Sequence, residues 1–163
     1  MGILAGVLAL ALSAAPSAAD DATRDMPVAA SDLPRDMPTS EADFYLAGQD
    51  FARCGGHLAF AAEIARGQNM PANATAFENN ERAWRIAGLV LLASGVDPAR
   101  QSNVEQLFDD MEAGKVAQLL AWRESDPDGY GERMTSQFRD DCLPWVPVQN
   151  AIIAALRGAA APR

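Results

Sequence analysis

His57, the only histidine among 163 residues, is the clearest candidate for proton chemistry. Histidine titrates near neutral pH and can act as a general base or a metal ligand. Asp43, Asp50 and His57 are spaced seven apart, which places them on nearly one line of a helix, but with about 10 Å between neighbours. The closer Arg53 disfavours a charged imidazole. We therefore expect His57 on a solvated or boundary face, with a small-ligand or hydrolase pocket around it as the alternative.

The two cysteines, Cys54 and Cys142, are the most specific structural signal. One histidine and two cysteines do not supply the common zinc ligand sets. No C-x-x-C motif is present, and Cys54 stands before His57 in the wrong order for a haem attachment site. In an oxidising compartment, two cysteines of a small domain usually pair. We predict a structural disulfide, with intermolecular pairing, a redox pair, or metal or haem attachment as alternatives.

An acidic turn at residues 126–132 has a partial likeness to a calcium-binding loop. Asp126, Asp128 and Gly131 fit the first, third and sixth positions, but the fifth and twelfth positions do not carry the expected ligands. Pro127 at the second position adds a further misfit. A helix-breaking turn is therefore the main interpretation, and weak calcium binding by Asp126, Asp128 and Glu132 is the alternative. No other metal and no cofactor is expected.

Three aromatic residues near predicted turns and helix ends are candidate anchors for a protein partner: Trp122, Tyr130 and Trp145. Packing at the edge of the core, over the disulfide, is the other interpretation. Three acidic residues, Asp109, Asp110 and Glu112, spread around one helix, so we expect them on a solvated face and not as paired catalytic carboxylates. No catalytic residue can be assigned from these patterns, and whether the chain is an enzyme stays open.

The charge balance limits the classes of partner. The chain has 13 Lys and Arg against 22 Asp and Glu, which gives a formal net charge of −9. Binding to nucleic acid or to an anionic membrane surface requires clustered basic residues. We therefore expect no nucleic acid as a partner. The acidic surface, the predicted N-terminal tether and the lack of a catalytic constellation favour a protein partner instead.

Residues 1–19 have the pattern of a secretory signal peptide, although its first region lacks Lys and Arg. An apolar run from Ile3 to Leu12 precedes Ser17-Ala18-Ala19, and the first charged residues follow. An uncleaved membrane anchor is the alternative, but the run is shorter than the roughly 20 residues that span a bilayer. No later segment is apolar enough to be a transmembrane candidate. Arg outnumbers Lys twelve to one, which favours a GC-rich Gram-negative bacterium and a periplasmic or extracellular location.

Residues 20–39 have the composition of a disordered, Pro-rich linker. Pro27, Pro34 and Pro38 accompany small and acidic residues, with no helical apolar stripe. The tetrapeptide Arg-Asp-Met-Pro occurs at residues 24–27 and again at 35–38. We interpret the segment as a tether, and a bivalent docking motif is the alternative.

From residue 40 onward the periodicity is almost entirely helical. Capping patterns predict a helix starting near Ser40 and a second starting at the Thr75 and Glu78 capping box. A third starts at Asp97 and Pro98, and its phase changes near Gly114, which predicts either a kink or two helices. The predicted helices end near residue 67, at residue 95 and near residue 125, and two further helices cover about 131–142 and 148–157. Residues 158–163 are a predicted flexible tail.

Small residues recur every four positions in the first predicted helix, at Gly48, Ala52 and Gly56. Gly inside a helix costs about 0.5–1 kcal/mol relative to Ala, so we expect these positions to face a closely packed helix. No stretch alternates with a period of two.

The sequence therefore predicts an all-α domain over residues 40–157, a compact antiparallel bundle of four to five helices stapled by one disulfide. The main functional hypothesis is a non-enzymatic periplasmic accessory, adaptor or binding module for a protein partner. An acid-stress periplasmic chaperone is one alternative, because protonating carboxylates would loosen an acidic fold. A small-ligand binder or hydrolase with a pocket near His57 is the other.

Overall fold

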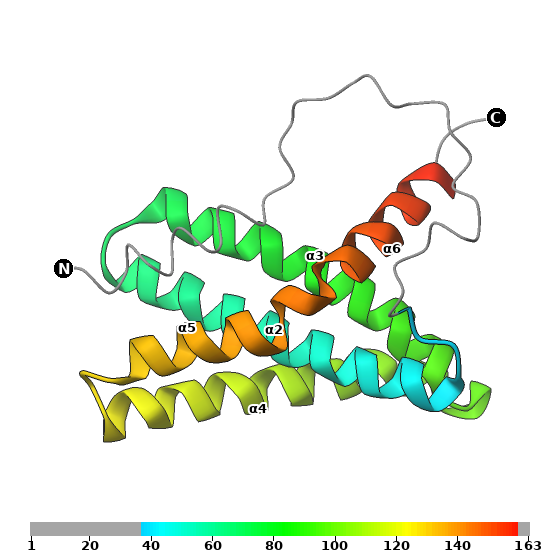
Figure 1. Cartoon of the computed structure of the whole chain (residues 1–163), viewed down its shortest axis with the longest axis horizontal. Helices are drawn as coiled ribbons and strands as arrows, with labels where there is room; N and C mark the ends of the chain where they lie inside the picture. Colours follow the sequence, from blue (N-terminus) through cyan, green and yellow to red (C-terminus); the bar gives the residue numbers. More distant parts are fainter. Residues whose placement is uncertain (1–36, 160–163) are drawn as a thin grey trace.

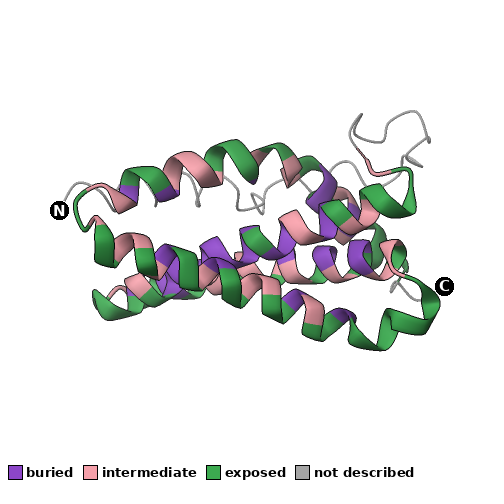
Figure 2. Cartoon of the chain, turned by 90° about the horizontal axis from the view of Figure 1, so that it is seen from below, coloured by how far each residue is buried: buried purple, intermediate pink, exposed green. Residues whose placement is uncertain are grey.

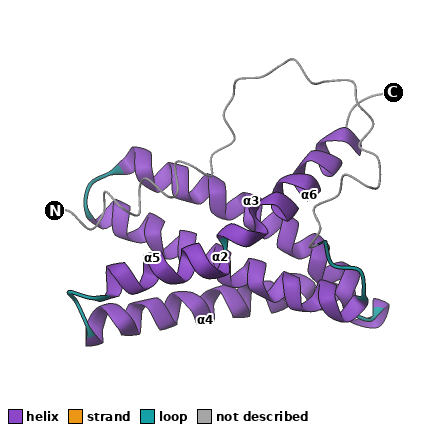
Figure 3. Ribbon diagram, viewed as in Figure 1, coloured by secondary structure: helices purple, strands orange, loops and turns teal. Residues whose placement is uncertain are grey.

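A computed structural model describes residues 37–159, and Figures 1 and 3 show this part as helices joined by short loops. The predicted signal peptide and most of the predicted linker and tail lie outside the described residues. The described part contains five α-helices and two 3₁₀-helices, with no strand among them. In chain order these elements are α2 (Glu41–Gly67), α3 (Pro71–Gly95), η2 (Pro98–Asn103), α4 (Val104–Ser125), α5 (Tyr130–Asp141), η3 (Leu143–Trp145) and α6 (Val146–Ala159).

The ends of α2 confirm the sequence prediction, whereas the start of α3 corrects it. The Ser40 hydroxyl accepts a hydrogen bond from the backbone N–H of Asp43, and the helix ends at Gly67. The second helix begins at Pro71, one turn earlier than predicted, so Thr75 lies inside it. Pro71 needs no N–H partner at the first helical position and has a helical φ already fixed. A helix start at Pro71 is therefore favoured over a start at the predicted Thr75 and Glu78 capping box.

Two other helix predictions are also refined. Asp97 does cap a helix start, since its carboxylate accepts from the backbone N–H of Ala99, but the helix it caps is η2. The following α4 is a single helix from Val104 to Ser125, and it runs without interruption past Gly114. Both halves of α4 pack against α2. The first half also meets α3, where Phe108 packs with Leu92, and the second half also meets α5, where Leu119 packs with Met134.

Successive long helices run antiparallel, so α2 and α4 run in the same direction (Figure 1). Glycines in α2 allow the close approach that the sequence predicts. A Cβ atom at Gly48 would lie 2.6 Å from Leu92 Cγ of α3. A Cβ at Gly56 would lie 2.7 Å from both the Glu112 carbonyl oxygen and Lys115 Cβ of α4. These glycines place α2 at the centre of the bundle.

The buried residues gather where the helices face one another (Figure 2). Three apolar clusters form the core, and α2 contributes to all of them. They are represented by Phe51, Trp84 and Ile152, by Leu92 and Phe108, and by Phe60, Leu119 and Met134. Within the described residues, no helix is both long enough and apolar enough to cross a membrane.

The predicted disulfide is present. Cys54 in α2 and Cys142, directly after α5, are bonded, with 5.7 Å between their Cα atoms. Both residues are 1% exposed, so the bond lies inside the core. The fold is therefore the predicted all-α bundle, with its central helix tied to the end of α5.

Candidate functional site

A cavity of about 230 Å³ lies beside the disulfide, where α2, α4 and the end of α5 meet. Both cysteines form part of its wall. The other residues that line it are all ionisable: Asp50, Arg53, His57, Lys115 and Asp141. The sequence predicted a pocket near His57 only as an alternative, and the structure places His57 in such a cavity.

His57 is buried, which corrects the expectation of a solvated or boundary face. The residue is 3% exposed, because α4 and α5 cover the side of α2 from which it extends. Its ring meets the ring of Phe138 edge-on, with 5.8 Å between centroids. Neither Nδ1 nor Nε2 has a hydrogen-bond partner among the described residues. Buried polar atoms normally have partners, so an imidazole of this kind is exceptional.

Lys115, the only lysine of the chain, lies in the same cavity and is 6% exposed. Its Nζ donates to Gln118 Oε1 at 2.8 Å and to Gln137 Oε1 at 2.7 Å. The ammonium also lies 5.5 Å from the centre of the Trp122 ring. None of the sequence patterns predicted a functional role for Lys115. The feature that sets Lys115 apart in the sequence is its rarity, since it is the one lysine in a chain with twelve arginines. The structure shows it buried in the same cavity as the one histidine.

The two carboxylates and the guanidinium are more exposed than His57 and Lys115. Asp50 and Arg53 form an ion pair, with 2.8 Å between Asp50 Oδ1 and Arg53 Nη1. Burial raises the pKa of Asp50, while Arg53 acts against this rise. Asp141 is exposed. These three residues form the rim of the cavity, and His57 and Lys115 form its buried part.

The electrostatics of the cavity keep His57 neutral. Burial, and then the positive charge of Lys115, lowers the pKa of His57 from 6.5 to about 3. Burial also lowers the pKa of Lys115, although Asp141 raises it. An imidazole with a pKa near 3 is a weak general base at neutral pH. The arrangement therefore suits hydrogen bonding to a bound molecule better than proton abstraction.

A second polar cluster joins α3 and α4. Arg85 Nη1 lies 2.6 Å from Asp109 Oδ1 and 3.5 Å from Glu112 Oε2. Burial, and then the charge of Glu81, raises the pKa of Glu112 to about 7. The side chain of Glu112 is only 17% exposed, so the expected solvated acidic face is wrong for this residue. Asp109 and Asp110 are exposed as expected.

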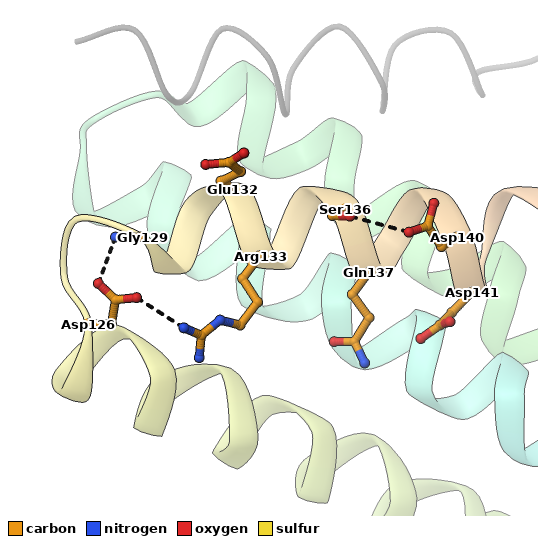
Figure 4. A pocket seen from close by; sticks show the side chains of 8 residues that line it. All are labelled: Asp126, Gly129, Glu132, Arg133, Ser136, Gln137, Asp140 and Asp141. Atoms are coloured by element: carbon orange, nitrogen blue, oxygen red, sulfur yellow. Dashed lines mark hydrogen bonds and ion pairs between the residues drawn. The ribbon is translucent and has the colours of Figure 1, made fainter.

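The acidic turn at residues 126–132 has a local structural role. Asp126 Oδ1 accepts from the backbone N–H of Gly129 at 2.9 Å, and Asp126 Oδ2 pairs with Arg133 at 3.0 Å. The Glu132 carboxylate points away from that of Asp126 (Figure 4). Across residues 37–159, no group of three or more His, Cys, Asp or Glu side chains is arranged to hold a metal ion. Asp126, Asp128 and Glu132 are therefore not brought together as calcium ligands.

The three predicted partner anchors, Trp122, Tyr130 and Trp145, are half-buried. Trp145 meets the ring of Phe51 edge-on, with 5.8 Å between centroids, and Trp122 lies beside the Lys115 ammonium. Each of these two rings therefore has a contact within the fold. A role in binding a protein partner stays a prediction.

Comparison of the chain with protein-family models, with curated proteins and with solved structures finds no match.

Proposed function

We propose that the protein is an exported, non-enzymatic binding module that holds a small polar molecule in the cavity beside the disulfide. The observation that supports this proposal is the buried, unpartnered imidazole of His57 inside a cavity of about 230 Å³. A neutral imidazole offers one N–H donor and one acceptor nitrogen. Leaving both unpaired in a low-dielectric site costs free energy that a hydrogen-bonding ligand would recover.

A ligand screen on the whole mature protein tests this function. Because His57 is the only histidine, its two ring nitrogens give unique ¹⁵N resonances. We expect at least one class among small amides, amines, amino acids, sugars and carboxylates to shift these resonances. The same compounds should raise the melting temperature, because a ligand at a hundred times its Kd stabilises the folded state by about 2.7 kcal/mol.

A rim variant and its neighbour provide the matched control. Asp141 lines the cavity, whereas the adjacent exposed Asp140 does not. Asp141→Trp should obstruct the cavity and abolish the shifts, and Asp140→Trp should leave them unchanged. If no class of compound moves the His57 resonances, or if both variants behave alike, the cavity is not a binding site.

Export is the second part of the proposal, and it depends on the signal-peptide pattern of residues 1–19. A periplasmic location would also supply the oxidising environment in which Cys54 and Cys142 pair. Mature protein purified from a periplasmic fraction should begin at Asp20. Protein retained in the cytoplasm with Met1 intact would contradict this.

A second candidate function, the acid-stress chaperone, is favoured by the same histidine. The pKa of His57 is about 3 in the folded state and 6.5 when the side chain is not buried. As the pH falls, the unfolded chain therefore binds the proton before the folded protein does. Stability contributed by the neutral ring is complete above pH 6.5 and is lost as the pH falls toward 3, by at most about 1.4 kcal/mol per pH unit. Acid would thus loosen the site at the disulfide.

Circular dichroism and a client-aggregation assay at about pH 3 test the chaperone function. The wild type should loosen and protect a client protein, whereas His57→Phe, which cannot be protonated, should stay folded to lower pH and protect less. A wild-type fold that stays rigid at pH 3 would reject this function. The protein-partner adaptor stays a prediction that a pull-down from periplasmic extract can address.

A further inference from the structure

Lys115 carries a buried charge that no direct ion pair in the described region neutralises. Its Nζ is held by two neutral amide oxygens, from Gln118 and Gln137. None of the ion pairs between described residues includes it. A buried ammonium without a direct ion pair is costly, because its lost hydration is not fully repaid. The negative charge of Asp141 at the rim offsets this cost only in part, since the pKa of Lys115 still lies below its ordinary value. The cavity therefore favours a ligand that brings one negative charge.

His57 adds a directional donor to this charge. His57 is 3% exposed, it lines the same cavity as Lys115, and neither of its ring nitrogens has a partner among the described residues. The Lys115 ammonium has three N–H groups, and two of them are used by the glutamines. One N–H of Lys115 and one N–H of His57 are thus available to the two oxygens of a carboxylate.

The size and the rim of the cavity restrict the anion further. A volume of about 230 Å³ is below the roughly 300–1,000 Å³ typical of sites for drug-sized ligands. Arg53 is already paired with Asp50, and Asp141 stands unpaired among the described ion pairs at the rim. A dianion such as phosphate would be repelled by these two carboxylates and would exceed the single charge of Lys115.

We propose that the cavity binds a small monocarboxylate of about two to four carbon atoms, with Lys115 and His57 donating to its two oxygens. This inference rests on the proposed function, and it names the chemical class of the ligand. Lys115 supplies the charge that selects an anion, and His57 fixes the orientation of the carboxylate. The carbon chain lies against the disulfide.

The test is an NMR titration of the intact, oxidised protein at constant ionic strength. Acetate, propionate and butyrate are compared with propionamide, which has the same shape without the charge, and with inorganic phosphate. We expect propionate to shift the His57 ring ¹⁵N resonances saturably, and propionamide and phosphate to bind at least tenfold more weakly. Lys115→Met should weaken propionate binding at least tenfold.

Lys115→Arg keeps the charge and should retain most of the affinity, which separates loss of charge from loss of fold. Circular dichroism checks the fold of each variant. Asp141→Asn removes a repulsive charge at the rim and should strengthen propionate binding about two- to fivefold. The exposed neighbour provides the control, since Asp140→Asn should leave the affinity unchanged.

Several outcomes would overturn the inference. If propionamide or phosphate binds as tightly as propionate, or if a folded Lys115→Met variant keeps its affinity, the ligand is not a monocarboxylate held by Lys115. The broader proposal of a small-ligand site would survive those results, provided that other compounds still move the His57 resonances. If no compound of either panel moves them, both proposals fail.

Discussion

At the scale of single residues, Glu112 is an acid whose side chain is only 17% exposed. A Cβ atom added at Gly55 would lie 2.7 Å from Glu112 Oε1, so this oxygen packs directly on the α2 backbone. The same oxygen has no hydrogen-bond partner in the described part of the chain. Burial and the nearby Glu81 together explain why the pKa of Glu112 rises to about 7.

Replacing Glu112 by Gln should change how stability depends on pH. With a folded pKa of about 7 and an ordinary value of 4.5, the folded state holds the proton more tightly than the unfolded state. The stability that the protonated Glu112 carboxyl contributes is complete below pH 4.5 and is lost as the pH rises through 7. Glu112→Gln should therefore stabilise the protein at pH 8 by about 1–2 kcal/mol and have little effect at pH 4.5. Urea denaturation across this range measures the difference.

The control for this prediction is Glu105→Gln on the same helix. Glu105 is exposed and makes none of the ion pairs in the described region. Its replacement should change the stability at pH 8 by less than about 0.5 kcal/mol. Equal effects of the two replacements would show that Glu112 is not a destabilising buried charge.

At the scale of the helices, two glycines that look alike in the sequence have opposite roles. Gly56 lies where α2 and α4 touch, with both backbone and side-chain atoms of α4 in the space of a Cβ. Gly114 lies inside α4, is exposed, and has nothing within 4 Å of an added Cβ. One glycine is required by packing, and the other only weakens its helix.

Alanine at these two positions should therefore change stability in opposite directions. Gly56→Ala must push apart α2 and α4 and should destabilise the fold by about 1–3 kcal/mol. Gly114→Ala should stabilise it by about 0.5–1 kcal/mol, because alanine is the better helix former. Chemical denaturation of both variants checks this. A stabilised Gly56→Ala variant would contradict the close approach of the two helices.

At the scale of the whole molecule, the disulfide connects the central helix to a point 88 residues further along the chain. In the chain-entropy model, closing a loop of this length contributes about 4–5 kcal/mol as an upper figure. Typical domains are stable by about 5–15 kcal/mol in total. The disulfide therefore accounts for a large part of the expected stability.

Reduction should lower the melting temperature by on the order of 10 °C or more. Calorimetry with and without a phosphine reductant measures the shift, and alkylation with mass spectrometry verifies the number of free thiols. A Cys54→Ala, Cys142→Ala double variant should melt like the reduced protein. An unchanged melting temperature with two titratable thiols, or two free thiols in the native oxidised protein, would contradict this role.

The sequence predicted the all-α class, the helix ends at Ser40 and Gly67, and the disulfide. These features depend on local patterns: apolar residues spaced three and four apart, capping side chains, and the presence of two cysteines in a small domain. The same patterns failed where two local signals competed. Thr75 can cap a helix, but Pro71 already starts one, and the phase change near Gly114 does not break α4.

The sequence by itself therefore determined which segments are helical and which side chains are rare enough to matter. Only the tertiary structure decided that His57 is buried and that it shares a cavity with Lys115, 58 residues away in the chain. The physical reason is that helical periodicity shows which residues share a face of one helix, and only packing decides which neighbouring helix covers that face. Here α4 and α5 cover a polar side of α2, and they enclose two titratable groups that a helix exposed to water would have left solvated.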